Sequence, residues 1–134
     1  MLTYAVSARR IDASGSIAHV KEAELLLDTG VAGRKDAFNP AELLLAALCA
    51  CIIKGIERVV PLISFDLDGV EVSVVAERQD APPKIVRITY DLAVRTSESG
   101  QRLELLHTNV KKYGTIFNTL AAATDITGTI RRLG

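Results

Sequence analysis

The chain has two cysteines, Cys49 and Cys51, and they are the residues best suited to covalent chemistry. A thiolate can act as a nucleophile, reduce a peroxide or ligate a metal. The two cysteines stand two positions apart inside an unbroken apolar run, residues 43–53. On a helix this spacing turns their side chains about 200° apart, so they can neither bridge nor share a metal ion. Each thiol could equally be a small buried hydrophobe, the usual role of a free cysteine in a core.

Other residue patterns that could do chemistry are weak. His19 and His107 are far apart, and without a Cys-x-x-Cys pattern they do not indicate a zinc site. There is no Gly-x-Ser-x-Gly, and neither histidine has the setting of a catalytic base, so a Ser/His/Asp hydrolase is not favoured. His107 is predicted to be a surface residue of an amphipathic helix. We therefore expect chemistry carried by cysteine alone, with no cofactor and no metal.

The apolar run follows a strong helix-start signal, Asn39-Pro40-Ala41-Glu42. Asn39 can cap free backbone N–H groups, Pro40 suits the first helical position, and Glu42 can reach back to complete a capping box. The run leaves no polar stripe at helical periodicity, which predicts a helix covered on every side. With eleven apolar residues it is too short for a bilayer, which needs about 18 or more.

An all-round apolar helix raises the question of what covers its second side, because one sheet covers only one face. A second copy of the chain could supply the cover, which predicts a homodimer. Helices from the C-terminal part of the same chain are the alternative.

Composition indicates one domain over residues 1–134. The chain is 49% hydrophobic, and no Pro-, Gly- or Ser-rich stretch divides it. Sixteen basic residues balance sixteen acidic ones, and no basic run with interleaved aromatics occurs, so we expect no nucleic-acid partner and no membrane partner. The sequence starts without a charged leader before an apolar stretch, which predicts a reducing cytoplasmic location and free thiols.

The segments outside the central helix alternate between strand and helix patterns. Residues 70–74 and 86–95 alternate apolar and polar side chains around Asp80-Ala81-Pro82-Pro83, and are predicted to pair as antiparallel neighbours. Further strands are expected over residues 2–10, 16–27 and 126–133, with a turn at 12–15. Helices are expected over residues 101–113 and 115–123. The predicted class is α+β, with mainly antiparallel sheet packed on a central helix.

One segment carries a family resemblance. Residues 36–51, Asp-Ala-Phe-Asn-Pro-Ala-Glu-Leu-Leu-Leu-Ala-Ala-Leu-Cys-Ala-Cys, resemble the Asn-Pro-x-Glu/Gln-Leu...Ala-Ala...Cys segment of the OsmC/Ohr family, the osmotically induced and organic hydroperoxide resistance proteins. In that motif the peroxidatic cysteine lies twelve residues after the asparagine, which is Cys51 here. The resemblance implies an OsmC-like fold and an intertwined homodimer with two active sites at the subunit interface. It also implies reduction of organic hydroperoxides with an external thiol reductant.

The chain departs from the family pattern at positions 114, 115 and 41. Residues 113–120 are similar to the family's second-cysteine segment, but the resolving cysteine falls at Gly114 and the following proline at Thr115. The family carboxylate, ten residues before the reactive cysteine, falls at Ala41. Glu42 is its neighbour, but one position turns a helical side chain by about 100°, and capping already accounts for Glu42.

The family arginine aligns best with Arg10, at the end of the first strand. Arg9 and Arg34 are the other candidates, and any of the three could be solvated surface. In the resulting hypothesis, Cys51 attacks the peroxide, Arg10 holds the thiolate and polarises the peroxide, and an external thiol reduces the sulfenic acid. Cys49 is assigned to the core.

The alternative hypothesis keeps the same fold and dimer without peroxidase activity. The chain would then bind a small apolar ligand or catalyse another thiol-based reaction.

Overall fold

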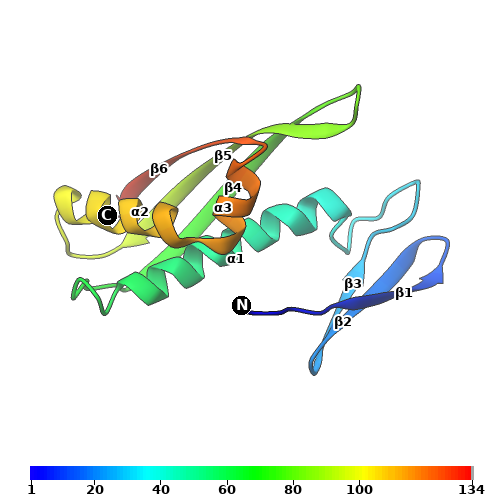
Figure 1. Ribbon diagram of the computed structural model, residues 1–134, viewed down its shortest axis with the longest axis horizontal. Helices are drawn as coiled ribbons and strands as arrows, with labels where there is room; N and C mark the ends of the chain where they lie inside the picture. Colours follow the sequence, from blue (N-terminus) through cyan, green and yellow to red (C-terminus); the bar gives the residue numbers. More distant parts are fainter. Residues whose placement is uncertain (134) are drawn as a thin grey trace. The chain divides into compact units, whose positions relative to one another are not determined.

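The structure, a computed structural model, describes residues 1–133. The chain forms two compact units, Met1–Leu44 and Leu45 onward, each with its own three-stranded sheet (Figure 1). Helix α1 (Pro40–Val59) starts in the first unit and continues into the second. The α+β class is confirmed, and the expectation of one domain over residues 1–134 stays a prediction.

The first unit is a meander of three antiparallel strands, β1 (Ser7–Asp12), β2 (Gly15–Val20) and β3 (Ala23–Leu27). The expected turn over residues 12–15 joins β1 to β2. The expected single strand over residues 16–27 is wrong in one respect, because it is two strands that reverse at Lys21, whose φ is 54°. The reversal uses Lys21-Glu22 without the Gly, Asn or Pro that normally signals a turn.

Cross-strand register gives this first sheet two different faces. Residues directly opposite each other on neighbouring strands share a face. One face carries mostly apolar side chains, while the other carries His19 and Glu24, whose Nδ1 and Oε1 atoms lie 3.4 Å apart. The rows on the first face are Ala8–Ala18–Leu25 and Arg10–Ser16–Leu27.

The second unit has the sheet order β4-β5-β6, from β4 (Gly69–Gln79), β5 (Lys84–Arg95) and β6 (Asp125–Leu133). The predicted antiparallel pairing of β4 and β5 is confirmed. Strand β6 pairs parallel to β5, because the chain crosses back through α2 (Gly100–Tyr113) and α3 (Thr115–Ala121) before it re-enters the sheet. Both helices begin within one residue of their predicted starts.

The core of the second unit joins α1, α2 and one face of the sheet. On α1 the buried residues recur at helical spacing along one side: Leu48, Ile52, Gly55, Ile56 and Val59. The opposite side stays partly open in the single chain: Leu43, Ala46, Ala50 and Ile53. The expectation of a helix covered on every side is therefore not met by one chain alone.

Helices α1 and α2 are fixed to each other at two points. At their crossing, a Cβ added to Gly55 would meet the Val110 side chain at 3.4 Å, so the absence of a side chain allows a close approach. Farther along, Arg102 donates hydrogen bonds from Nη2 to the carbonyls of Ile63, at 2.5 Å, and Ser64, at 3.3 Å, just beyond the end of α1. Together the two contacts hold both ends of α2 in place.

Candidate active site around Cys51

The start of α1 has the capping box that the sequence predicted. The backbone N–H of Glu42 donates to Asn39 Oδ1 at 2.8 Å, and the N–H of Asn39 donates to Glu42 Oε1 at 2.9 Å. Reciprocal bonds of this kind satisfy free donors at a helix N-terminus. Glu42 therefore caps the N-terminus of α1, as the sequence predicted.

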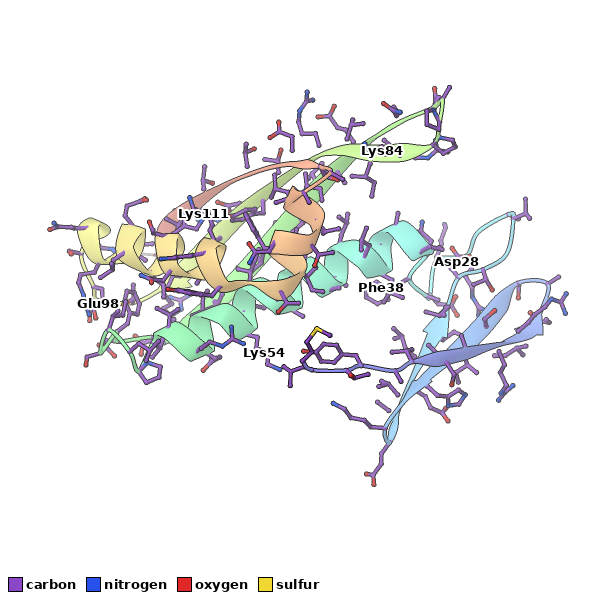
Figure 2. All side chains as sticks on the ribbon, viewed as in Figure 1. Asp28, Phe38, Lys54, Lys84, Glu98 and Lys111 are labelled. Atoms are coloured by element: carbon purple, nitrogen blue, oxygen red, sulfur yellow. The ribbon has the colours of Figure 1, made fainter. Side chains whose placement is uncertain are left out.

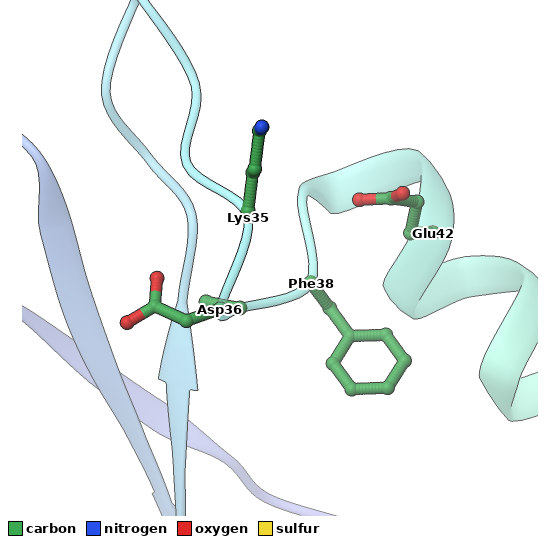
Figure 3. A pocket seen from close by; sticks show the side chains of 5 residues that line it. Lys35, Asp36, Phe38 and Glu42 are labelled. Carbon is green, nitrogen blue, oxygen red and sulfur yellow. The ribbon is translucent and has the colours of Figure 1, made fainter.

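A pocket of about 350 Å³ lies beside this helix start, in the first unit (Figure 3). Its two carboxylates are both engaged, since Glu42 caps α1 and Asp36 accepts two hydrogen bonds from Arg34 at 2.6 and 2.9 Å. Both carboxylates that line the pocket are therefore already hydrogen-bonded within the chain. Its lining residues are Lys35, Asp36, Ala37, Phe38 and Glu42.

Cys51 lies on α1, half-buried, with its sulfur against the turn that joins α2 to α3. A Cβ added at Gly114 would lie 3.1 Å from Cys51 Sγ and 3.1 Å from the Phe117 Cβ. In a disulfide, the Cβ of one residue lies about 3 Å from the sulfur of the other. Position 114 is thus at disulfide-forming distance from Cys51.

The backbone of Gly114 does not itself require glycine. Its φ of −76° and ψ of 120° lie in the extended region that any residue adopts. The missing side chain instead allows the turn to approach the thiol closely. A cysteine at this position would therefore face Cys51.

Cys49 has a different environment from Cys51, although both are half-buried and free. Burial raises the pKa of the Cys49 thiol above its ordinary value. A raised pKa lowers the thiolate fraction at neutral pH and with it the reactivity. The geometry is consistent with Cys49 as a packing residue.

The three candidate arginines differ in what they contact. Arg34 is held by Asp36, which raises the pKa of the Arg34 guanidinium and commits it to the loop. Arg9 and Arg10 point to opposite faces of β1, and Arg10 shares the mostly apolar face with Ser16 and Leu27. Neither takes part in an ion pair among residues 1–133. Arg10 therefore lies on the mostly apolar face, whereas Arg9 stands opposite Ile17 on the other face.

A buried polar pair that the sequence did not reveal lies in the second unit. His107 is 4% exposed and Tyr90 is 3% exposed, and Tyr90 Oη lies 2.5 Å from His107 Nε2. The prediction of His107 as a surface residue is therefore wrong. The available signal was its spacing, because His107 fills the helical stripe of Leu103, Leu106 and Val110.

Two further features bear on ligands and membranes. Within residues 1–133, no three His, Cys, Asp or Glu side chains come together as a metal site would require. No helix in that part of the chain combines the length and apolar character needed to cross a bilayer.

Comparison with known proteins identifies the architecture. An OsmC-like protein from Mycoplasma pneumoniae is 18% identical, with a TM-score of 0.89 over 99% of each chain. An organic hydroperoxide resistance protein from Legionella pneumophila is 17% identical, with a TM-score of 0.73 over 97% of this chain and 98% of that one. The organic hydroperoxide resistance protein OhrB of Bacillus subtilis is 16% identical, with a TM-score of 0.72 over 97% and 98%. No curated protein matches the chain.

At these identities the solved structures establish the fold, an α+β protein of the OsmC-like type. The family pattern described as OsmC-like protein matches residues 33–128, which is most of the sequence. The chain belongs to the OsmC-like protein family.

Proposed function

We propose that this protein reduces organic hydroperoxides by a one-cysteine cycle at Cys51, with an external thiol as reductant. The observation that carries the proposal is the contact between Cys51 Sγ and the Gly114 turn. It supports Cys51 as the counterpart of the family's reactive cysteine and Gly114 as the counterpart of its partner. The relatives from Legionella pneumophila and Bacillus subtilis, both called organic hydroperoxide resistance proteins, support the choice of substrate.

The proposed cycle balances without a second protein thiol. Thiolate Cys51 attacks the distal oxygen of ROOH, the O–O bond breaks, and the products are a sulfenic acid and an alkoxide that takes a proton to become ROH. One external thiol then displaces water from the sulfenic acid to form a mixed disulfide. A second external thiol releases Cys51 and leaves as the reductant's disulfide. Cys49 takes no part, because its side chain points about 200° away on the helix.

Arg10 is the proposed cation of the site. A guanidinium beside a thiol favours the thiolate and can polarise the peroxide. Two observations support Arg10 over the other candidates: Arg34 is occupied by Asp36, and Arg9 lies on the face with the His19–Glu24 pair. An arginine on an apolar face is available for a partner that covers that face.

A homodimer is the proposed assembly, in a reducing compartment such as the cytoplasm. The open side of α1 carries apolar residues spaced alternately by three and four, which is the pattern of a helix that packs on another helix. A second copy would cover this stripe and also the mostly apolar face of the first sheet. The stripe consists of Leu43, Ala46, Ala50 and Ile53.

The test follows the fate of Cys51 after one equivalent of cumene hydroperoxide. Dimedone should trap a sulfenic acid on Cys51, and no intramolecular disulfide should form. Added thiol should restore the reduced protein and permit turnover. Cys51→Ser should abolish peroxide consumption, whereas Cys49→Ser should leave it within about twofold of wild type, because a packing thiol takes no part in the cycle.

Arg10→Ala and Arg9→Ala form a matched pair on opposite faces of β1. Arg10→Ala should slow Cys51 oxidation by at least about tenfold, the loss expected when one charged group leaves a reacting site. Arg9→Ala should leave the rate unchanged. If wild type consumes hydroperoxide no faster than Cys51→Ser, the peroxidase proposal fails, and the function is apolar-ligand binding or another thiol-based reaction.

A further inference from the structure

The Tyr90–His107 pair is a buried polar contact that the proposed cycle does not use. Tyr90 comes from β5 and His107 from α2, and their rings meet edge to face with centroids 5.6 Å apart. Gly128, opposite Tyr90 on β6, has no room for a Cβ because the Tyr90 ring occupies that space. The ring is therefore fixed by β6 on one side and by the His107 hydrogen bond at its hydroxyl.

The fixed ring also contacts the turn beside Cys51. Tyr90 and Phe117 pack edge to face with centroids 6.3 Å apart, a favourable aromatic arrangement. Phe117 lies in α3, and its Cβ would be 3.1 Å from a Cβ at Gly114. A continuous series of contacts therefore runs from His107 through Tyr90 and Phe117 to Gly114 and Cys51.

We propose that Tyr90 and His107 are positioning residues that hold the Gly114 turn against Cys51, and that charging of His107 releases this hold. In the proposed arrangement the neutral His107 ring carries its proton on Nδ1, and Nε2 accepts the Tyr90 hydroxyl hydrogen, which keeps the ring against Phe117. Protonation of Nε2 removes this acceptor and places a charge in the buried site. The consequence for Cys51 reactivity rests on the function proposed above, whereas the hold itself can be tested without peroxide.

The charges that act on His107 set the direction of the pH effect. On its own helix, Lys111 disfavours the charged imidazole and Glu104 favours it (Lys111 is labelled in Figure 2). Tyr90, from β5, presents a hydroxyl whose pKa burial raises to about 12, so it stays protonated. Phe117 from α3 and Gly128 from β6 add no charge.

Burial first, and Lys111 second, lower the pKa of His107 below its ordinary 6.5. A histidine whose pKa is depressed by folding is neutral in the native state at pH 7. The unfolded chain takes up the proton as pH falls through 6.5, so the free energy of unfolding starts to fall there, whereas the native contact is released only as pH approaches the lower pKa of His107 in the folded protein. The hold should therefore be full at about pH 7.5 and reduced at about pH 5.

A cysteine introduced at position 114 provides a reporter of the turn. In Gly114→Cys, the equilibrium between glutathione and the disulfide that joins Cys51 to the introduced thiol measures how often the turn lies against Cys51. At about pH 7.5, Tyr90→Phe in this background should lower the effective concentration of the two thiols roughly three- to tenfold, the range expected for loss of one buried hydrogen bond. Thr108→Ala, next to His107 on the exposed side of α2, is the matched control and should change nothing.

His107→Gln separates the acceptor from the charge. Glutamine can accept the Tyr90 hydroxyl hydrogen but cannot be protonated, so the reporter disulfide should stay within about twofold of its parent at about pH 7.5. If Tyr90→Phe leaves the effective concentration unchanged while the protein stays folded, the pair does not hold the turn, and the positioning proposal is overturned.

The pH effect is measured on the natural Gly114 protein by hydrogen exchange, which also covers the case in which Gly114→Cys does not fold. Amides of residues 113–118 should exchange several-fold faster in wild type than in His107→Gln at about pH 5, and equally at about pH 7.5. Comparison at one pH cancels the chemical exchange rate. Equal exchange at the lower pH would overturn the release by His107, and a lack of peroxidase activity would leave both measurements valid.

Discussion

The first 44 residues and the rest of the chain bury their apolar side chains to different extents. The second unit contains every member of the apolar core, including Leu48, Leu92 and Leu106, which are fully buried. None of residues 1–44 belongs to that core, and the buried polar side chains of this stretch are Ser16 and Asp28. Many of its apolar side chains remain exposed in the single chain, among them Leu2, Tyr4 and Val6.

The first unit is organised mainly by its strand ladder and by polar contacts in the loop before α1. Ser16 Oγ and Thr29 Oγ1 lie 2.6 Å apart, and the Arg34 N–H donates to Asp28 Oδ2 at 3.1 Å. A three-stranded sheet needs a covered apolar face to be stable alone. The second unit is therefore stabilised by its own packing, whereas the first unit needs cover that its own residues do not supply, which supports the proposed dimer.

The strongest change should come from Ile53→Arg, which we expect to abolish the dimer. Ile53 is 38% exposed in the single chain and lies in the open apolar stripe of α1. A charge there would be desolvated without a partner in the proposed interface, which costs several kcal/mol. Sedimentation at micromolar concentration should show wild type as a dimer with no folded monomer. The Ile53→Arg variant should not form the dimer.

The matched control is Val75→Arg, which places the same charge on another exposed β-branched residue. Val75 is 68% exposed on β4, away from the α1 stripe. The Val75→Arg variant should remain dimeric. A stable, compact wild-type monomer, or an Ile53→Arg variant that sediments like wild type, would contradict the dimer and leave the first unit without its expected cover.

A smaller effect is expected from a paired truncation, Leu106→Ala and Leu25→Ala. Leu106 is fully buried in the second unit, so its truncation should lower the free energy of unfolding by about 2–5 kcal/mol. Leu25 is 39% exposed on the mostly apolar face of the first sheet, and its truncation should act mainly on dimer stability. Urea unfolding of both variants and wild type at one protein concentration measures the losses, because folding and association are coupled in a dimer that has no folded monomer. The Leu106→Ala loss should be the larger, and an equal or larger loss in Leu25→Ala would contradict the contrast between the two units.

The sequence predicted those parts of the fold that depend on local pattern. The start of α1 was predictable because Asn39, Pro40 and Glu42 each have a positional role there, and β4 and β5 were predictable because they alternate around a proline-containing connection. The turn at Lys21 was missed because its residues carry no turn signal. The parallel pairing of β6 depends on where α2 and α3 return the chain, and a local pattern does not encode that.

The candidate site likewise contains residues that the sequence predicted and contacts that only the structure shows. Cys51 was predicted from its spacing from Asn39, and the sequence alone shows that position 114 is a glycine and carries no thiol. The contact between Gly114 and Cys51 joins segments far apart in the chain, so it required the structure. Tyr90 and His107 were missed because a histidine in an amphipathic helix is normally assigned to the polar face, whereas here a single hydroxyl makes its burial possible.

The smallest expected effect concerns the helix caps, one in each unit. Asn39→Ala should remove the bond that Asn39 Oδ1 accepts from the Glu42 N–H at 2.8 Å, and cost about 1 kcal/mol of unfolding free energy. Ser99→Ala should cost less, about 0.5 kcal/mol, because the Arg102 N–H donates to Ser99 Oγ at a longer 3.3 Å. Asn39→Asp keeps an acceptor and should recover most of the loss. Urea unfolding measures all three, and a larger loss in Ser99→Ala than in Asn39→Ala would mean that the start of α1 frays without consequence for the second unit.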